Sequence, residues 1–185
     1  MKIRELKKQI SERLQFTDYE RIVEWINKAI EQISLYNLRH CVTGKVITLD
    51  GSGSYDISDC LEVQKVFNEK FSAFLRLPYE EYKILTEKAG CYAIFGNKIY
   101  IEGKDEKVHL IYIPKFEILL DDEAENIITQ SYPELVIYNS LYQGFIFLED
   151  FNNAQVEKQR FESRLLEIMR LEREAFYKNY QGYYL

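Results

Sequence analysis

The sequence predicts an α+β fold in which a helical bundle carries an antiparallel β insertion between its N-terminal and C-terminal helices. Apolar residues recur every three or four positions in both terminal parts of the chain, which is the period of an amphipathic helix. The middle of the chain changes to short β-branched and aromatic runs separated by glycine-containing turns, which are typical of antiparallel strands. We therefore expect the bundle at 1–42 and 114–178, the β insertion at 43–113, and a C-terminal aromatic arm at 179–185.

The N-terminal part of the bundle is expected to contain two helices, near 2–15 and 17–39. Isoleucine and leucine residues repeat at helical spacing through both segments. Thr17 and Glu20 have the spacing of a capping box, in which the two side chains satisfy free backbone N–H groups at a helix start. Lys and Arg outnumber Glu in the first of these helices, and we interpret this excess as a solvated helix face.

The middle segment alternates between strand-like runs and turns. Asp50–Ser54 and Gly96–Asn97 are expected to be hairpin turns, because each lies between two apolar runs. Pro78 is expected in the first turn of a short helix over 78–85. The expected strands are Val46–Leu49, Tyr55–Ile57, Val63–Phe67, Phe71–Leu75, Tyr92–Phe95, Ile99–Ile101 and Val108–Ile113.

Two further helices are expected near 121–149 and 152–177. The acidic run 121–125 is expected at the start of the first, where the helix dipole is positive. Ser131 and Glu134 have the spacing of a second capping box. The residues that follow are apolar nearly all round, which indicates a helix at the centre of the bundle. The predicted shared core is Ile26, Ile30, Leu135, Tyr138, Leu141, Phe145, Phe161, Leu165 and Ile168.

Composition favours protein contacts over nucleic-acid binding. The chain has 185 residues, with 24 Lys and Arg against 30 Asp and Glu, for a formal net charge of −6. This balance argues against broad binding to a phosphate backbone. The 15 Tyr and 11 Phe residues favour protein interfaces, since aromatic side chains offer large contact areas. The N-terminus is too polar for a signal peptide and no apolar run reaches the length of a membrane span, so no membrane association is expected.

No arrangement of residues points to catalysis, a metal or a cofactor, and we expect the chain not to be an enzyme. The cysteines Cys41, Cys60 and Cys91 form no CxxC pair, and neither they nor His40 and His109 have the usual spacing of metal ligands. One alternative stays open: Cys60 or Cys91 could meet His109 in space as a nucleophile and its base.

The order of elements resembles that of the head-to-tail adaptor (connector or ring) proteins of tailed bacteriophages, over nearly the whole chain. The segment YERIVEWINKAIEQI (19–33) resembles a family helix of the W-I-N-x-A type. The segment ITLDGSGSYDISDCLEVQKV (47–66) resembles the family's hairpin and following strand, with Ser58 where proline is usual. The segment YAIFGNKIYIEG (92–103) resembles a second strand pair, with Gly103–Lys104 in place of a proline-rich turn.

The closing block carries the fourth landmark. IYIPKFEILLDDEAENIITQSYPELVIYNSLYQGFIFLED (111–150), followed by QVEKQRFESRLLEIM, resembles the family's succession of a tyrosine-containing strand, an acidic turn, a Pro-x-Leu helix and a terminal helix. The resemblance implies a structural virion protein in the neck, made in the bacterial host cytoplasm. It implies a homo-oligomeric ring, commonly of twelve subunits, that binds the portal and tail or neck proteins.

In such a ring the channel of the portal continues, and DNA passes without sequence-specific binding. The C-terminal aromatic residues are the expected portal-binding or partner-binding site, since they extend beyond any obvious core: Tyr177, Tyr180, Tyr183, Tyr184 and Leu185. One alternative is a stopper or tail-completion protein of the same neck. The other is a small enzyme or a host-directed binding protein that uses the sheet surface.

Overall fold

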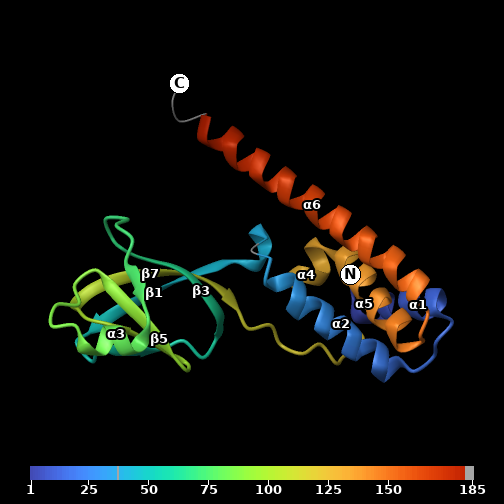
Figure 1. Ribbon diagram of the computed structural model, residues 1–185, viewed down its shortest axis with the longest axis horizontal. Coiled ribbons are helices and arrows are strands. Elements are labelled where there is room, and N and C mark those ends of the chain that lie inside the picture. The colour runs from blue at the N-terminus through green and yellow to red at the C-terminus, as the bar shows by residue number, and fades with distance from the viewer. Residues whose placement is uncertain (37, 182–185) are drawn as a thin grey trace. The chain divides into compact units, whose positions relative to one another are not determined.

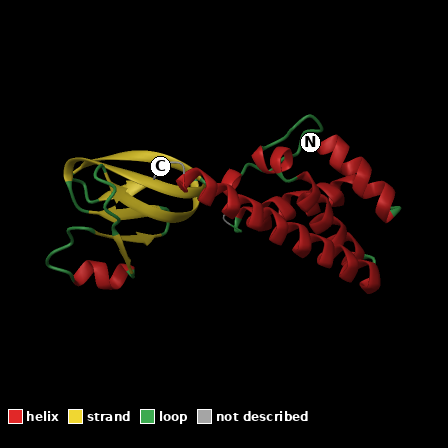
Figure 2. Cartoon of the chain, turned by 90° about the horizontal axis from the view of Figure 1, so that it is seen from above, coloured by secondary structure: helices red, strands yellow, loops and turns green. Residues whose placement is uncertain are grey.

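The computed structural model describes residues 1–36 and 38–181, and from 175 onward it describes only the helix backbone. The chain divides into a helical unit, Met1–Cys41 with Phe116–Leu185, and a β unit, Val42–Lys115. Helices lie at both ends of the chain and strands lie between them (Figures 1 and 2). The C-terminal helices pack against the N-terminal ones. The predicted α+β fold is therefore confirmed.

The helical unit is arranged around α5. Its elements are α1 (Ile3–Leu14), α2 (Tyr19–Ser34), the 3₁₀ turn η1 (Arg39–Cys41), α4 (Ile127–Ser131), α5 (Pro133–Phe147) and α6 (Phe151–Gln181). Helix α5 packs against α1, α2, α4 and α6, so its apolar residues are covered on several sides. This is the central position that its uniform hydrophobicity predicts.

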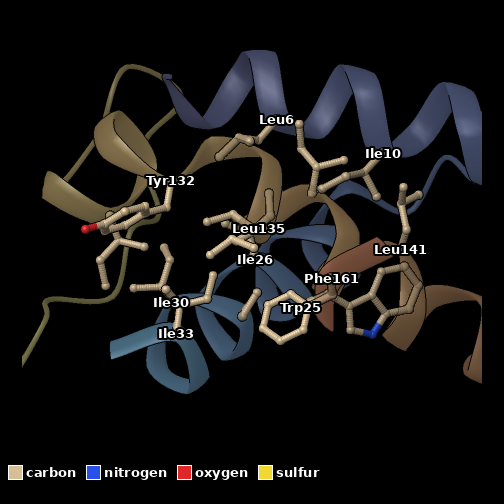
Figure 3. Packing of buried hydrophobic residues seen from close by; sticks show 14 of the residues in the cluster. Leu6, Ile10, Trp25, Ile26, Ile30, Ile33, Tyr132, Leu135, Leu141 and Phe161 are labelled. Atoms are coloured by element: carbon tan, nitrogen blue, oxygen red, sulfur yellow. The ribbon is translucent and has the colours of Figure 1, made fainter. Parts of the chain in front are cut away.

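Most of the predicted core lies in the buried cluster of this unit (Figure 3). Six of the nine residues are buried, namely Ile26, Ile30, Leu135, Leu141, Phe161 and Leu165. The other three are partly buried and pack against the cluster, namely Tyr138, Phe145 and Ile168. Helix α1 adds a layer of its own, through Ile3, Leu6, Ile10 and Leu14.

The helix starts differ from the predicted capping boxes. Asp18, not Thr17, caps α2, and its side chain accepts a hydrogen bond from the backbone N–H of Arg21. The predicted helix over 121–149 begins only at Ile127, after Asn126, whose side chain accepts from two backbone N–H groups. It then breaks at Tyr132, because proline disfavours helical geometry in the residue before it. The predicted box of Ser131 and Glu134 therefore does not form.

Two helix ends also differ. Helix α2 stops at Ser34, whose hydroxyl donates a hydrogen bond to the Glu31 carbonyl at 2.6 Å, so the predicted extension to 39 is replaced by η1. Helix α6 runs to Gln181, beyond the predicted end at 177. An Arg170–Glu174 pair at i,i+4 spacing supports its last described turns.

The β unit contains two sheets that share one core. The three-stranded sheet has the order β1 (Thr43–Asp50), β7 (Lys104–Pro114), β3 (Cys60–Asn68), and both pairings are antiparallel. The four-stranded sheet has the order β2 (Ser54–Asp56), β6 (Lys98–Ile101), β5 (Cys91–Phe95), β4 (Leu75–Leu77). Side chains from both sheets, among them Leu49, Val66, Ile99 and Leu110, form the buried cluster.

Two details of the β unit were not predicted. Strand β4 pairs with β5 in parallel, whereas the other pairings are antiparallel. The expected strand over 71–75 does not form as such, because Phe71 has a positive φ of 59° and lies in a turn. The short helix α3 (Tyr79–Ile84) follows Pro78, as expected.

The acidic segment 121–125 has a role other than starting a helix: it holds the N-terminus of α1. The backbone N–H of Ile3 donates to the Ala124 carbonyl at 3.1 Å, and that of Arg4 to the Asp122 carbonyl at 3.0 Å. Glu123 forms ion pairs with Lys2 and Arg4. The basic face of α1, interpreted from the sequence as merely solvated, therefore pairs with carboxylates about 120 positions later.

Truncation of Leu141 should destabilise the chain more than truncation of Phe145. Leu141 is fully buried, so Leu141→Ala removes transfer energy and leaves a cavity, at a cost of about 2–5 kcal/mol. Phe145 is only partly buried, so Phe145→Ala should cost less than the 3–5 kcal/mol typical of a fully buried Phe. Chemical denaturation measures both, and a larger loss for Phe145→Ala would contradict the packing of α5.

The contact between 121–125 and α1 should weaken in acid. The hydrogen bond from Lys2 lowers the pKa of Glu123 below its ordinary value of 4.5. A carboxyl whose pKa is lowered by folding stabilises the protein above its unfolded pKa, and this contribution disappears as the pH falls through the folded pKa. Glu123→Gln should therefore lower the melting temperature at pH 7, and this effect should shrink progressively as the pH falls below the ordinary value of 4.5.

The matched control is Glu117→Gln, since the exposed Glu117 has no ion pair among the described residues. Its melting temperature should follow the wild type at both pH values. An equal effect of Glu123→Gln at pH 7 and in acid would show that the carboxylate charge does not hold α1.

Candidate assembly surfaces

One end of the helical unit carries a group of aromatic rings, which we call the aromatic corner. Phe16, Trp25 and Phe147 come from the α1–α2 turn, from α2 and from the end of α5, and their ring centroids lie 5.5 to 5.9 Å apart. The backbone N–H of Phe16 donates to the Ser11 carbonyl, and the Ser11 hydroxyl donates to the Phe16 carbonyl at 2.7 Å. These bonds fix the ring at the end of α1.

Close helix packing brings α5 to this corner. A Cβ added at Gly144 would overlap the Leu14 side chain and lie 3.1 Å from the Trp25 ring. Glycine is therefore needed for the approach of α5 to α1 and α2 at this point. The arrangement leaves Phe147 packed on one face and 51% exposed overall.

Further exposed apolar side chains lie beside the aromatic corner, at the α5–α6 turn. Besides Phe147, they are Ile146, Leu148 and Phe151, the last of which is 64% exposed. Several exposed apolar side chains at one turn favour a protein contact. The Arg21 guanidinium lies 5.4 Å from the centroid of Phe147 and covers part of that ring.

Carboxylates outnumber arginines in the segments that form the aromatic corner. Six of them lie near the ends of α1, α2 and α5, against two arginines, Arg13 and Arg21: Glu12, Asp18, Glu20, Glu24, Glu149 and Asp150. Asp18 and Asp150 accept hydrogen bonds from backbone N–H groups at helix starts. Within the described part of the chain, Glu20 and Glu149 have no cationic partner within 4.0 Å.

A second exposed aromatic group lies on the outer face of the three-stranded sheet, and we call it the aromatic sheet face. Phe67 and His109 are paired across β3 and β7 and stack with a centroid distance of 6.2 Å. Phe71 lies 6.2 Å from Phe67 and 6.3 Å from His109. Val46, paired with His109 from the β1 side, is 52% exposed.

The turn after β3 presents Phe71 to solvent. The Asn68 side-chain oxygen accepts from the backbone N–H groups of Lys70 and Ser72, each at 3.0 Å. The Phe71 N–H donates to the Asn68 carbonyl at 2.9 Å. These bonds hold Phe71 at positive φ, a conformation that costs a non-glycine residue about 1–3 kcal/mol, with 79% of its surface exposed.

Three lysines flank the aromatic sheet face. Lys65 and Lys107 lie on β3 and β7 beside Phe67 and His109, and Lys70 lies in the turn beside Phe71. Among the described residues none of the three has a carboxylate within 4.0 Å. Glu69 in the same turn and Arg13 at the aromatic corner are also without an ion pair among the described residues, so the unpaired charge is predominantly positive at the aromatic sheet face and predominantly negative at the aromatic corner.

The predicted partner-binding residues lie outside the described side chains. Tyr177, at the predicted end of the last helix, and Tyr180, expected beyond it, both fall on the backbone of α6. Tyr183, Tyr184 and Leu185 lie beyond the described residues. Their role stays a prediction. Sequence reasoning missed both aromatic surfaces, since it placed Phe67 in a strand and considered His109 only as a metal ligand or a base.

The cysteine and histidine alternatives gain no support. Burial raises the pKa of Cys60 to about 11 and, together with Glu172, that of Cys41 to about 12, so both remain protonated thiols at neutral pH. Cys60 pairs with Pro114 and His109 with Phe67, so the register separates Cys60 from His109 along β7, and Cys91 lies on β5 of the other sheet. No group of three or more metal-binding side chains occurs within the described residues.

No helix in the described part of the chain is long and apolar enough to cross a membrane.

Replacing Phe71 should not destabilise the fold. The substitution Phe71→Asn removes the weak stacking of the Phe71 ring. Asparagine tolerates positive φ better than phenylalanine does, so the relief of backbone strain offsets this loss. We expect a free energy of unfolding equal to or above that of the wild type. Phe67→Asn is the control and should lose about 1 kcal/mol or more, since Phe67 packs within the sheet. A loss for Phe71→Asn equal to that for Phe67→Asn would contradict this reading of the turn.

Comparison with known families places this geometry in a biological context. The family model for the SU10 adaptor protein matches residues 1–181, nearly the full chain. Among curated proteins, none matches. The chain therefore belongs to the SU10 adaptor protein family, a family of phage head-to-tail adaptors.

Proposed function

We propose that this member of the SU10 adaptor family forms a ring beneath the portal of a tailed bacteriophage, joins the portal to tail components, and extends the channel for DNA. The observation that carries the proposal is the family match over residues 1–181. The ring is proposed to contain twelve copies, and the protein is proposed to act in the virion neck after synthesis in the host cytoplasm.

Exposed aromatic residues on both units support a joining role. Phe147 and Phe151 of the helical unit and Phe71 of the β unit each expose half or more of their surface. Aromatic side chains supply much of the contact energy at protein interfaces. A protein that must hold several neighbours needs more than one such surface, and both units of this chain expose aromatic side chains.

The charge of the chain supports a channel in which DNA slides. The formal net charge is −6, so tight neutralisation of phosphates is disfavoured. Cationic groups that could grip DNA are in part engaged within the protein, as Lys2, Arg4 and Lys7 are by the segment 121–125. We therefore propose transient, sequence-independent contact with DNA and no catalytic step.

The C-terminal aromatic arm is the proposed anchor on the portal. Tyrosine offers a large ring and a hydroxyl at a low cost in side-chain entropy, which suits a segment that inserts into a groove. The residues proposed to contact the portal are Tyr177, Tyr180, Tyr183, Tyr184 and Leu185.

The test mixes the purified chain with purified portal rings and images the product by negative-stain electron microscopy. The proposed function expects an additional ring of density on one face of the portal. Portal rings that remain bare at micromolar adaptor would contradict it. Binding to tail components but not to the portal would favour the stopper or tail-completion role.

Deleting 179–185 should weaken attachment to the portal and leave the melting temperature nearly unchanged. The expectation follows because these residues are proposed to bind a partner and not the core. The matched control, Asn179→Ser with Gln181→Ser, keeps the length of the arm and its aromatic residues and should bind normally. If the deletion lowers the melting temperature and attachment persists, the arm belongs to the fold of the helical unit.

A further inference from the structure

We propose that the aromatic corner of one copy docks on the aromatic sheet face of a neighbouring copy, and that this contact joins subunits head to tail. The proposal rests on the ring formation proposed above and names the two surfaces that would meet. The occupant of each surface is thus a second copy of this chain.

Ring formation requires two different surfaces on each subunit. A contact between identical patches closes after two copies, whereas a contact between unlike patches continues from copy to copy and can close into a ring. The chain provides such a pair, because the aromatic corner belongs to the helical unit and the aromatic sheet face belongs to the β unit.

The apolar parts of the two surfaces suit each other in chemistry. The aromatic corner exposes Phe147 and Phe151 by 51% and 64%, and the aromatic sheet face exposes Phe71 by 79%. Rings that already stack on neighbours within their own unit are pre-ordered, so little side-chain entropy is lost when they are covered. Covering Phe71 should stabilise the contact most, because the strained turn already holds this ring outward in the free subunit.

The charges determine which surfaces meet. Glu20 and Glu149 beside the aromatic corner have no cationic partner among the described residues, and Lys65, Lys70 and Lys107 beside the aromatic sheet face have no carboxylate partner there. Two copies of the aromatic corner would bring carboxylates together, and two copies of the aromatic sheet face would bring lysines together. Like charges disfavour both of these pairings, and the unlike pairing matches the charges.

A third aromatic group, on the four-stranded sheet, is the competing surface for this contact. Tyr79 stacks on Phe95 with centroids 4.7 Å apart. Lys83 beside it is engaged by Glu80 at 3.4 Å. Lys98, however, which is paired with Phe95 across β5 and β6, has no carboxylate partner among the described residues. Reversing Lys98 therefore tests whether this group, and not the aromatic sheet face, meets the aromatic corner.

The experiment reverses charges on each surface and then on both. The corner variant is Glu20→Lys with Glu149→Lys, and the sheet variant is Lys70→Glu with Lys107→Glu. Mass photometry and sedimentation velocity of the full chain measure self-association over a range of concentrations. Each variant alone should raise the dissociation constant at least about tenfold, because like charges then face each other. The two variants mixed, with their reversed charges facing each other, should associate again.

Controls separate surface effects from net charge and from misfolding. Glu31→Lys with Glu117→Lys has the charge change of the corner variant, and Lys28→Glu with Lys98→Glu has that of the sheet variant, at exposed positions outside both surfaces. Both should associate like the wild type. Phe71→Asn should also reduce association while its melting temperature is kept, which tests the apolar part of the contact independently of charge.

The outcomes distinguish this inference from the proposed function. If the wild type associates and the reversals change nothing, or if the mixture fails to restore association, the surfaces are wrong although the adaptor role stands. If the wild type stays monomeric both alone and on the portal, the subunit contact is wrong, and a single bound copy would show attachment to the portal without a ring. If rings form with the expected charge dependence but do not bind portal, the contact is right and the portal role is wrong.

Discussion

The burial of α5 is the constraint on which the rest of the structure depends. Apolar residues of this helix point in nearly every direction, so it must be covered by α1 and α2 from the N-terminal stretch and by α6 from its own stretch. The two stretches are separated in sequence by the whole β unit, so the helical unit forms only when the C-terminal stretch packs against the N-terminal one.

Segment 116–126 links the two stretches through polar bonds. The Asn27 side chain donates to the Leu119 carbonyl at 3.0 Å and accepts from its N–H at 2.8 Å, while carboxylates of 121–125 hold the start of α1. Residues so far apart in sequence meet only after a long loop closes, and this closure costs conformational entropy. The polar bonds of segment 116–126 help to offset that cost in the helical unit.

Periodicity predicted the parts of this fold that apolar burial determines. The stripe of α2, the uniform hydrophobicity of α5 and the change to strand-like runs after Thr43 each appear in the structure where the sequence places them. The details that failed depend on competition between local groups. Thr17 and Asp18 are both good caps, and only the geometry of the chain entering α2 selects Asp18. Acidic residues suit either a helix start or a cationic neighbour, and the sequence alone does not show that Lys2 and Arg4 lie opposite Glu123.

The candidate surfaces were harder to predict, because exposure is not visible in residue type. Trp25 is buried at 4% exposure, as its place beside the α2 stripe suggests, yet it forms the base on which the exposed Phe147 rests. Phe71 was expected to begin the strand Phe71–Leu75, because this run is rich in apolar and aromatic residues. The Asn68 side chain prevents this, since it satisfies two N–H groups within the turn and so competes with the ladder. The run Asn68-Glu-Lys70 has the composition of a turn, and this was a signal in the sequence. The exposure of Phe71 after it depends on the hydrogen bonds of the folded turn, which the sequence does not show.

The distribution of charge then explains how one chain can be stable alone and still keep surfaces for assembly. Many of its ionic groups satisfy each other within a unit, as Lys2 and Glu123 do in the helical unit and Lys88 and Glu102 do in the β unit. Exposed pairs of this kind contribute little to stability individually. The charges that remain unpaired beside the two aromatic surfaces cost nothing in the monomer, since water solvates them, and they oppose contact between identical surfaces. A strained Phe71 likewise gives the isolated β unit no benefit. An apolar surface of opposite charge would pair with the unpaired charges and cover the Phe71 ring, so both features would then stabilise a contact. A subunit contact in an adaptor ring would provide such a surface.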